Sequence, residues 1–238
     1  MSNEKSDMYE SGEFLANNPS YFTEDSPWKA QQIYRLLKNN NINVRTICEV
    51  GCGSGEVLHQ LMKLLDSDIK YTGYDISPLL SEIWEQRTSE SMEFFAKDFL
   101  LDEKSFDLAC YIDVVEHIEN YIDFLKKIKD RSEYKVFAFP LEISAAKAIF
   151  SKYYIHTHKK YGHIHFFNRE IVEFIFEDVG LNIIDSFLAP TAIALGGKSA
   201  SVTRSSRMLN IPRKLISKFS VDFAQRLLGG YAFYLLCK

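Results

Sequence analysis

The sequence TICEVGCGSGE, residues 46–56, places an apolar run directly before three closely spaced glycines. The apolar run predicts a short buried strand, and residues 56–65 have the apolar spacing of a helix. Glycines at a turn from strand to helix let the backbone bend tightly and bring its amides close to a ligand. We therefore expect a ligand-binding turn at this position.

Strand-like and helix-like segments alternate along the rest of the chain. Further strands are expected within residues 71–77, 92–100, 106–112, 134–140, 181–189 and 231–237, and further helices within residues 26–40, 79–88, 113–129 and 168–179. Strands separated by helices predict an α/β fold in which a doubly wound, mostly parallel sheet carries helices on both faces. We expect one such domain over residues 21–238, with an N-terminal cap helix at about 26–40.

Two segments differ from this pattern. Residues 1–20 are polar and acidic without periodicity, which predicts a flexible tail. Residues 198–226 contain seven Lys or Arg and one Asp, with apolar residues at spacings of four. This predicts a basic amphipathic helical insertion over about 198–228, before the last strand. It would cover a pocket and bind an anionic acceptor, or rest peripherally on an anionic membrane; the alternative is ordinary packing with a solvated basic face.

Composition excludes several classes of protein. With 46% hydrophobic and 25% charged residues, the chain resembles ordinary soluble domains. A net charge of −4 supplies no positive field to gather nucleic acid, so duplex binding is disfavoured. No apolar run reaches the roughly 18 residues of a transmembrane segment, and the start MSNEKSDMYE lacks a signal-peptide pattern, so we expect a cytoplasmic protein. The four cysteines lack paired spacing and are expected to be reduced and buried.

Two carboxylates narrow the choice of ligand for the glycine turn. The spacing is GxGxG rather than the GxGxxG that holds a dinucleotide pyrophosphate, which disfavours a nicotinamide dehydrogenase. Asp75 ends the next predicted strand, 20 residues after Gly55, where a carboxylate can accept hydrogen bonds from both ribose hydroxyls. Glu49, just before the glycines, would repel a pyrophosphate but suits an ammonium and a sulfonium. These features favour S-adenosylmethionine.

Four segments in this order resemble the motifs of class I S-adenosylmethionine-dependent methyltransferases of the small-molecule type. They are ICEVGCGSGEVL, YTGYDIS, FFAKDFL and FDLACYIDVVEHI. The resemblance covers roughly residues 21–190 and implies a Rossmann-like, seven-stranded sheet whose last strand is antiparallel. It also implies an enzyme that uses S-adenosylmethionine as its cofactor.

The resemblance implies contacts to the methionine half of the cofactor. The backbone of Gly51, Cys52 and Gly53 would approach the methionine and ribose. Glu49 would anchor the turn and the methionine ammonium, which the carbonyl of Ile112 would also face.

The resemblance implies a second set of contacts to the nucleoside. Asp75 would hold the ribose diol, with Ile76 against the adenine. Asp98 would meet the adenine amino group and Phe99 would cover the ring, although Asp98 also suits a plain loop or helix-cap role.

The chain before the first strand could form a lid over the cofactor. Tyr21 would lie in this lid, and Lys29 would pair with the methionine carboxylate. The alternative is a packing helix with a solvated Lys29.

Three histidines are candidates for chemistry on the acceptor. Methyl transfer mainly needs alignment and exclusion of water, but a hydroxyl acceptor must also lose a proton, and histidine matches the operating pH. His117 follows the fourth motif by one helical turn. His163 and His165 lie in GHIHFF, residues 162–167, which resembles a stretch that faces the acceptor in related enzymes. The alternative for each is a structural, hydrogen-bonded histidine.

Four of the six histidines lie within residues 156–165 and form two HxH pairs, which are potential metal ligands. No carboxylate or cysteine accompanies these pairs, and Lys159 and Lys160 add repulsive charge. We therefore expect no metal.

These features predict a methyltransferase that acts on a hydroxyl or amine of a small polar acceptor, such as a sugar, nucleotide-sugar or lipid-linked glycan. One alternative is methylation of a macromolecule, protein or tRNA, which the acidic charge and the absence of an RNA-binding module disfavour. Another is a non-catalytic S-adenosylmethionine-binding subunit, against which the intact Glu49, glycines and Asp75 argue.

Overall fold

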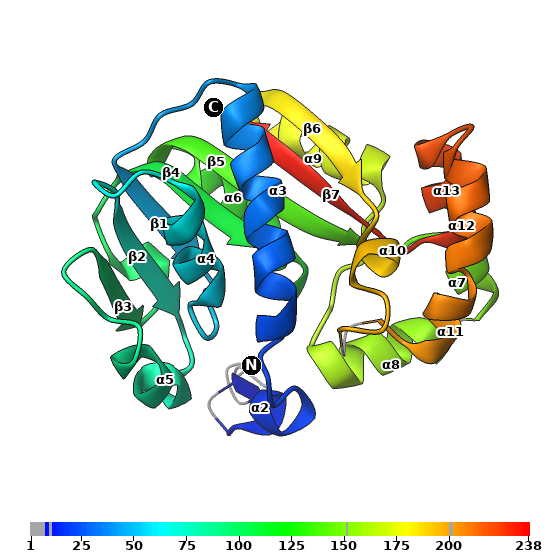
Figure 1. The fold of residues 1–238 in the computed structure, drawn as a ribbon, viewed down its shortest axis with the longest axis horizontal. Helices are drawn as coiled ribbons and strands as arrows, with labels where there is room; N and C mark the ends of the chain where they lie inside the picture. The colour runs from blue at the N-terminus through cyan, green and yellow to red at the C-terminus, as the bar shows by residue number, and fades with distance from the viewer. Residues whose placement is uncertain (1–7, 10, 151, 200–201) are drawn as a thin grey trace.

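A seven-stranded sheet in the order β3-β2-β1-β4-β5-β7-β6 forms the centre of the computed structural model, which describes residues 8–9, 11–150, 152–199 and 202–238 (Figure 1). The strands are β1 Thr46–Val50, β2 Lys70–Asp75, β3 Met92–Ala96, β4 Phe106–Ile112, β5 Ser132–Leu141, β6 Ile183–Ala189 and β7 Tyr231–Cys237. Strands β1 to β5 pair in parallel, whereas β7 runs antiparallel to both of its neighbours, β5 and β6. The expected Rossmann-like fold with a reversed last strand is confirmed.

Successive residues of the central strands point into two separate hydrophobic cores. On β5, Phe137 and Phe139 belong to one core, while Val136 and Ala138 belong to the other. The same alternation occurs on β4 and β7. Because strand side chains alternate between faces, the apolar runs read in the sequence imply a sheet that is covered on both sides.

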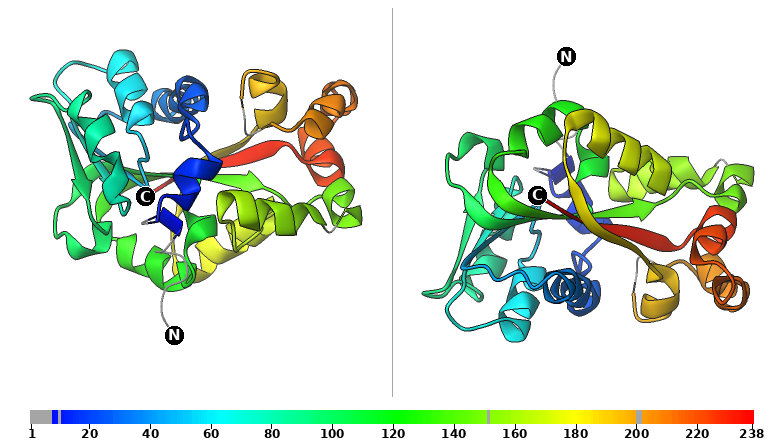
Figure 2. Two further views of the ribbon diagram at one scale, coloured as in Figure 1. Left: turned by 90° about the horizontal axis from the view of Figure 1, so that it is seen from below. Right: turned by 90° about the horizontal axis from the view of Figure 1, so that it is seen from above.

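Helices cover both faces, as Figure 2 shows. One face carries α3 Ser26–Asn39 and α4 Glu56–Leu64, and the other carries α6 Tyr121–Ile128 and α9 Arg169–Val179. The limits of α9 follow from its sequence, because Oδ1 of Asn168 accepts a hydrogen bond from the N–H of Ile171 at 2.8 Å and Gly180 ends the helix with a φ of 73°.

Further helices lie between these elements. They are α2 Glu13–Asn17, α5 Ser81–Glu85, α7 Ala145–Ile149, α8 Lys152–Tyr161, α10 Thr191–Leu195, α11 Arg204–Met208, α12 Asn210–Ser217 and α13 Val221–Leu228, with 3-10 segments η1 Thr23–Asp25, η2 Pro78–Leu80, η3 Phe99–Leu101 and η4 Val115–His117. Among the residues that the structure describes, no helix combines the length and the apolar character needed to cross a membrane.

The order of the strands fixes where a ligand can bind. The chain passes from β1 to β2 on one side and later returns to β4 on the other side of β1. In open α/β sheets this reversal leaves a crevice beyond the carboxyl ends of the strands.

The flexible tail expected over residues 1–20 is wrong for residues 11–20. Here α2 packs against α8, and Asn18 is buried with its Nδ2 donating to the carbonyl of Lys160 at 3.0 Å. The ring of Phe14 packs at a tilt against those of Tyr9 and Tyr21, with centroids 5.0 and 5.5 Å away. Aromatic residues scattered among polar ones give no periodic signal, although here they order the segment. Residues 1–7 and 10 lie outside the described part of the chain.

The basic segment before β7 forms three short helices, α11 to α13, rather than one amphipathic helix. Arg213 in α12 is buried and donates hydrogen bonds to the carbonyls of Gly229, Ser206 and Leu228. Its charge therefore ties α12 to the start of β7 instead of forming part of a solvated face. Residues 200–201 of the insertion lie outside the described chain.

Candidate active site

A cavity of about 1290 Å³ opens at the carboxyl ends of β1, β2, β4 and β5. Val50, Asp75, Ile112 and Leu141, which end these four strands, all line it. Its volume exceeds the usual upper size of about 1,000 Å³ for a site that holds one small molecule. The crevice therefore has room for two ligands side by side.

The glycine turn lines this cavity, and at Gly51 it leaves no room for a larger residue. Gly51 has a φ of 70°, and a Cβ atom there would lie 2.7 Å from Cγ2 of Val114. The carbonyl of Gly53 accepts a hydrogen bond from Nε1 of Trp84 at 2.9 Å, which fixes the turn from outside. Glycine at position 51 is thus required by packing as well as by backbone conformation.

Asp75 connects β2 to the glycine turn. Its Oδ2 accepts a hydrogen bond from the N–H of Gly53 at 2.8 Å, and its Oδ1 accepts one from the N–H of Ser77 at 2.9 Å. Burial raises the pKa of Asp75, and these backbone donors oppose the rise. Each oxygen keeps a second lone pair that can accept a bond from a ligand hydroxyl. Ile76, next to it, is 48% exposed in the cavity wall.

Glu49 is a buried carboxylate at the end of β1. Its side chain lines the cavity, yet its Oε2 has no hydrogen-bond partner among the described residues. Burial raises the pKa of Glu49 to about 8, and the nearby charge of Lys29 opposes this rise. A buried, unsatisfied carboxylate oxygen is costly in isolation, so this position suits a ligand that brings a cationic donor.

Lys29 is already paired within the protein. Its Nζ lies 2.8 Å from Oδ2 of Asp113, a residue held at a φ of 55° just after β4. Burial disfavours the charge of Lys29, but the carboxylates of Asp113, Asp25 and Glu49 together more than compensate and raise the pKa of this lysine. Tyr21, also with a positive φ, lines the cavity next to Gly53.

The residues expected around an adenine, Ile76, Asp98 and Phe99, all line the cavity. Oδ1 of Asp98 accepts a hydrogen bond from the N–H of Leu100 at 2.8 Å and so caps η3. Phe99 is buried, with its ring centroid 5.2 Å from that of Tyr74. Every residue predicted to contact the cofactor lines this cavity, namely Tyr21, Lys29, Glu49, Gly51, Cys52, Gly53, Asp75, Ile76, Asp98, Phe99 and Ile112.

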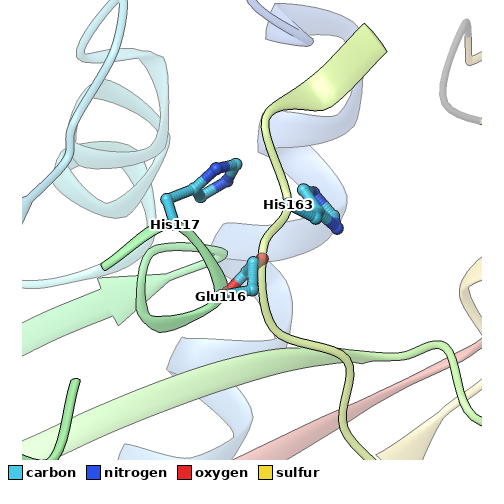
Figure 3. A group of neighbouring side chains, drawn as sticks. All are labelled: Glu116, His117 and His163. Carbon is cyan, nitrogen blue, oxygen red and sulfur yellow. The ribbon is translucent and has the colours of Figure 1, made fainter. Parts of the chain in front are cut away.

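Two of the three candidate catalytic histidines meet in the same cavity. His117 and His163 both line it, with their ring centroids 4.8 Å apart (Figure 3). Nδ1 of His163 lies 2.9 Å from Oε2 of Glu142, while Nδ1 of His117 lies 3.1 Å from the hydroxyl of Tyr9. His165 is not among the residues that line the cavity, and its Nε2 contacts the carbonyl of Glu119 at 3.2 Å.

Glu142 and Tyr9 are cavity residues that the sequence reasoning missed. Glu142 directly follows β5 and accepts a hydrogen bond from the hydroxyl of Tyr153 at 2.9 Å. An acid at the end of a predicted strand is the signal that identified Asp75. Glu142 lies two residues beyond the strand predicted over 134–140, so it gave only a weaker form of that signal. Tyr9 gave no such signal, yet its carbonyl accepts a hydrogen bond from the hydroxyl of Ser77 at 3.2 Å. Tyr9 thus contacts both the β2 end and the histidine side of the cavity.

A partly buried cation, Lys147, also lies on the histidine side of the cavity. Burial lowers the pKa of Lys147 to about 8, and the charge of Glu142 opposes this effect. Its Nζ lies 4.3 Å from the centre of the Tyr153 ring. The wall opposite the glycine turn therefore combines imidazole, carboxylate, phenol and ammonium groups, which suits a polar ligand.

Comparison with known proteins identifies the family of this chain. A family model described as a methyltransferase domain matches residues 24–186. The sequence matches no curated protein.

Solved structures share the fold. Magnesium protoporphyrin IX methyltransferase from Synechocystis PCC 6803, with bound SAH, is 13% identical with a TM-score of 0.57, over 89% of this chain and 82% of its own. N-methyltransferase NodS from Bradyrhizobium japonicum WM9 is 15% identical with a TM-score of 0.54, over 88% and 84%. A SAM-dependent methyltransferase from Archaeoglobus fulgidus is 19% identical with a TM-score of 0.55, over 88% and 94%.

Proposed function

Because this chain belongs to the methyltransferase domain family, we propose that it transfers a methyl group from S-adenosylmethionine to a hydroxyl or amine of a small polar acceptor. The observation that carries the proposal is the convergence of the glycine turn, Asp75 and the unsatisfied Glu49 on one cavity at the carboxyl ends of the strands. When bound, S-adenosylmethionine supplies a methyl group on a positively charged sulfur.

The residues on the glycine side would hold the cofactor. Asp75 would accept hydrogen bonds from the ribose hydroxyls through the lone pairs that Gly53 and Ser77 leave open. Glu49 would receive the methionine ammonium, which satisfies its unpartnered Oε2 and favours the ionised carboxylate. Ile76 and Phe99 would lie against the adenine, with Asp98 near its amino group.

The residues on the histidine side would hold the acceptor. The carboxylate of Glu142 can only accept a hydrogen bond, so Nδ1 of His163 carries the proton and a neutral ring presents Nε2 as a base. This ring can take the proton that a hydroxyl or amine loses on methylation. His117, 4.8 Å away ring to ring, would orient the same group. His165 has no part in this proposal.

The insertion before β7 supports a lipid-linked acceptor or contact with an anionic membrane. Ile211, Leu215 and Phe219 recur at intervals of four and are exposed, Phe219 at 93%. Lys214 and Lys218 lie on the same segment. Exposed apolar residues beside lysines are typical of a helix that rests in a membrane interface.

Calorimetry tests the cofactor assignment directly. The full chain should bind S-adenosylhomocysteine with micromolar affinity and should not bind NAD. The same protein should transfer a radiolabelled methyl group to some member of a panel of small hydroxyl and amine metabolites. Absence of S-adenosylhomocysteine binding by folded protein would overturn the proposal.

A further inference from the structure

Glu116, His117 and His163 bring three potential metal ligands together from two distant segments. Glu116 and His117 lie in η4, and His163 follows α8. One ligand atom from each lies within 4.8 Å of the others (Figure 3). The backbone holds these segments together, because the carbonyl of Glu116 accepts hydrogen bonds from the N–H groups of Ile164 and His165 at 3.0 and 3.2 Å.

Glu116 is a buried carboxylate without a hydrogen-bond partner in the part of the chain that the structure describes. Its side chain is 0% exposed, and neither Oε1 nor Oε2 has a hydrogen-bond partner among the described residues. Leaving a buried acceptor unsatisfied costs about 1–3 kcal/mol, and more for a charged group. Such a side chain is satisfied either by a proton or by a cation that binds between it and the two imidazoles.

The hydrogen bond of His163 orients the ring as in a metal site. Its Nδ1 donates to Oε2 of Glu142, which leaves Nε2 of the neutral ring as the nitrogen that can bind a metal. Glu142 is itself buried and is held through its Oε1 by the hydroxyl of Tyr153. Metal-binding histidines usually donate their other ring N–H to a carboxylate in this way, which fixes the ring and strengthens the ligand.

The surroundings favour a positive charge. The carboxylate of Glu142 lies 2.9 Å from Nδ1 of His163, and Asp113 precedes Glu116 by three residues. Lys29, the cation nearest to Asp113, is already paired with it at 2.8 Å. A divalent ion at this point would therefore be attracted by the carboxylates of Glu116 and Glu142, and by that of Asp113, whose charge Lys29 partly neutralises.

We propose that Glu116, His117 and His163 bind one divalent transition-metal ion, of the class of Zn²⁺ or Mn²⁺. Two imidazoles and a carboxylate are the ligands that these ions accept, and three protein ligands leave at least one position open. Tetrahedral metal–ligand bonds of about 2.0–2.2 Å place the ligand atoms roughly 3.4 Å apart, so a pair at 4.8 Å must close by about 1.4 Å when the ion binds. The sequence-based expectation of no metal considered only the HxH pairs, whereas the carboxylate comes from Glu116 in another segment.

The proposed metal site would add a second way for the cavity to activate an acceptor. His117 and His163 line the wall that is proposed to hold the acceptor, so the open metal position faces the same space. A bound ion would hold an acceptor oxygen and lower its pKa, in which case His163 acts as a ligand rather than as a proton acceptor. This consequence rests on the proposed methyl transfer, whereas metal binding itself does not.

Metal titration of the full chain, after removal of bound ions with a chelator, tests the proposal. One Zn²⁺ per chain should bind by calorimetry, and Co²⁺ should give the visible absorption of a nitrogen- and oxygen-coordinated ion. Glu116→Gln and His163→Ala should each lower Zn²⁺ affinity by more than about 100-fold, because they remove a ligand rather than an outer partner. His165→Ala is the matched control, since it removes the next histidine of the same loop, and it should leave binding unchanged.

A variant of Glu142, which orients His163 without binding the metal, provides a second test in case Glu116→Gln or His163→Ala fails to fold. Glu142→Gln should weaken Zn²⁺ binding by about 10–100-fold while leaving S-adenosylhomocysteine affinity unchanged. Absence of stoichiometric binding by the wild-type chain, or equal binding by folded His163→Ala and His165→Ala, would overturn the site. Because S-adenosylhomocysteine binding is measured separately, failure of the metal site and failure of the proposed methyl transfer can be told apart.

Discussion

The backbone N–H of Gly53 donates to Oδ2 of Asp75 at 2.8 Å, so the carboxylate proposed to hold the ribose also holds the glycine turn in place. Sequence spacing places these two residues at the ends of neighbouring parallel strands. Their direct contact means that cofactor binding and the shape of the turn depend on one side chain.

Substitution of Asp75 should therefore affect both binding and stability. Asp75→Ala leaves the N–H of Gly53 without its acceptor and should lower the free energy of unfolding by about 1–3 kcal/mol, besides abolishing S-adenosylhomocysteine binding. Asp75→Asn keeps an acceptor oxygen but loses the charge, so it should retain more stability while weakening binding by about 10–100-fold. Urea unfolding and calorimetry measure the two effects. Unchanged affinity in Asp75→Ala would refute the cofactor assignment.

Substitution of Gly51 should be destabilising for a steric reason that a second change can relieve. In Gly51→Ala the new Cβ would lie 2.7 Å from Cγ2 of Val114, at a φ of 70°, so we expect a loss of about 2–4 kcal/mol. Gly53→Ala, where the nearest atom is 3.6 Å away, carries only the backbone strain and should lose less. Val114→Ala should recover part of the loss in the Gly51→Ala background. Additive effects of the two changes in thermal melts would contradict the packing argument.

Glu49 should make both stability and cofactor binding depend on pH. Its pKa is raised from 4.5 to about 8 in the folded protein, so across this window the folded state holds one more proton than the unfolded chain. The free energy of unfolding of the free protein should therefore fall as pH rises through this range, while affinity for a ligand with an ammonium should rise.

Glu49→Gln is the variant that isolates this effect, because it keeps the shape of the side chain without the titration. Relative to wild type, its stability should vary less with pH between about pH 5 and pH 8. Its affinity for S-adenosylhomocysteine should be lower than that of wild type near pH 8 and nearly independent of pH. If wild type and Glu49→Gln show the same pH slope in both measurements, Glu49 does not receive the ammonium.

The exposed apolar residues of the insertion should determine membrane contact. Leu215→Glu with Phe219→Glu should lower binding to vesicles of phosphatidylcholine and phosphatidylglycerol by at least about tenfold, because two apolar contacts are lost and negative charge is added. Phe174→Glu on α9, also an exposed aromatic residue, is the matched control and should bind like wild type. Equal vesicle binding by all three proteins, measured by sedimentation, would exclude this surface.

The fold and the cofactor side of the cavity could be predicted because they depend on local patterns. Strand-like runs followed by Asp75 or by the glycine turn place their last residues at one edge of a parallel sheet, whatever the details of packing. Both ends of α9 could likewise be predicted, because Asn168 caps its beginning and Gly180 ends it.

The histidine side of the cavity could not be predicted, because it is formed by contacts between segments that are distant in the sequence. Hydrophobic periodicity carries no information about such contacts. His163 lies next to Glu116 because a loop after α8 bonds to the backbone of η4, and no spacing in the sequence expresses that contact. The sequence predicts Arg213 as part of a solvated basic face. In the structure its guanidinium is buried and donates hydrogen bonds to carbonyls just before β7. Tyr9 lies in a polar segment that is ordered by a few aromatic contacts.

Tyr9 has a thermodynamic consequence for how two substrates are used. Its carbonyl bonds to Ser77, beside Asp75, and its hydroxyl reaches His117 on the opposite side. A ligand that shifts this residue at one position changes the free energy of binding at the other, and reciprocity requires the coupling factor to be the same in both directions. The affinities for cofactor and acceptor would then be coupled through a single tyrosine, which contacts the end of β2 and the histidine side of the cavity at once.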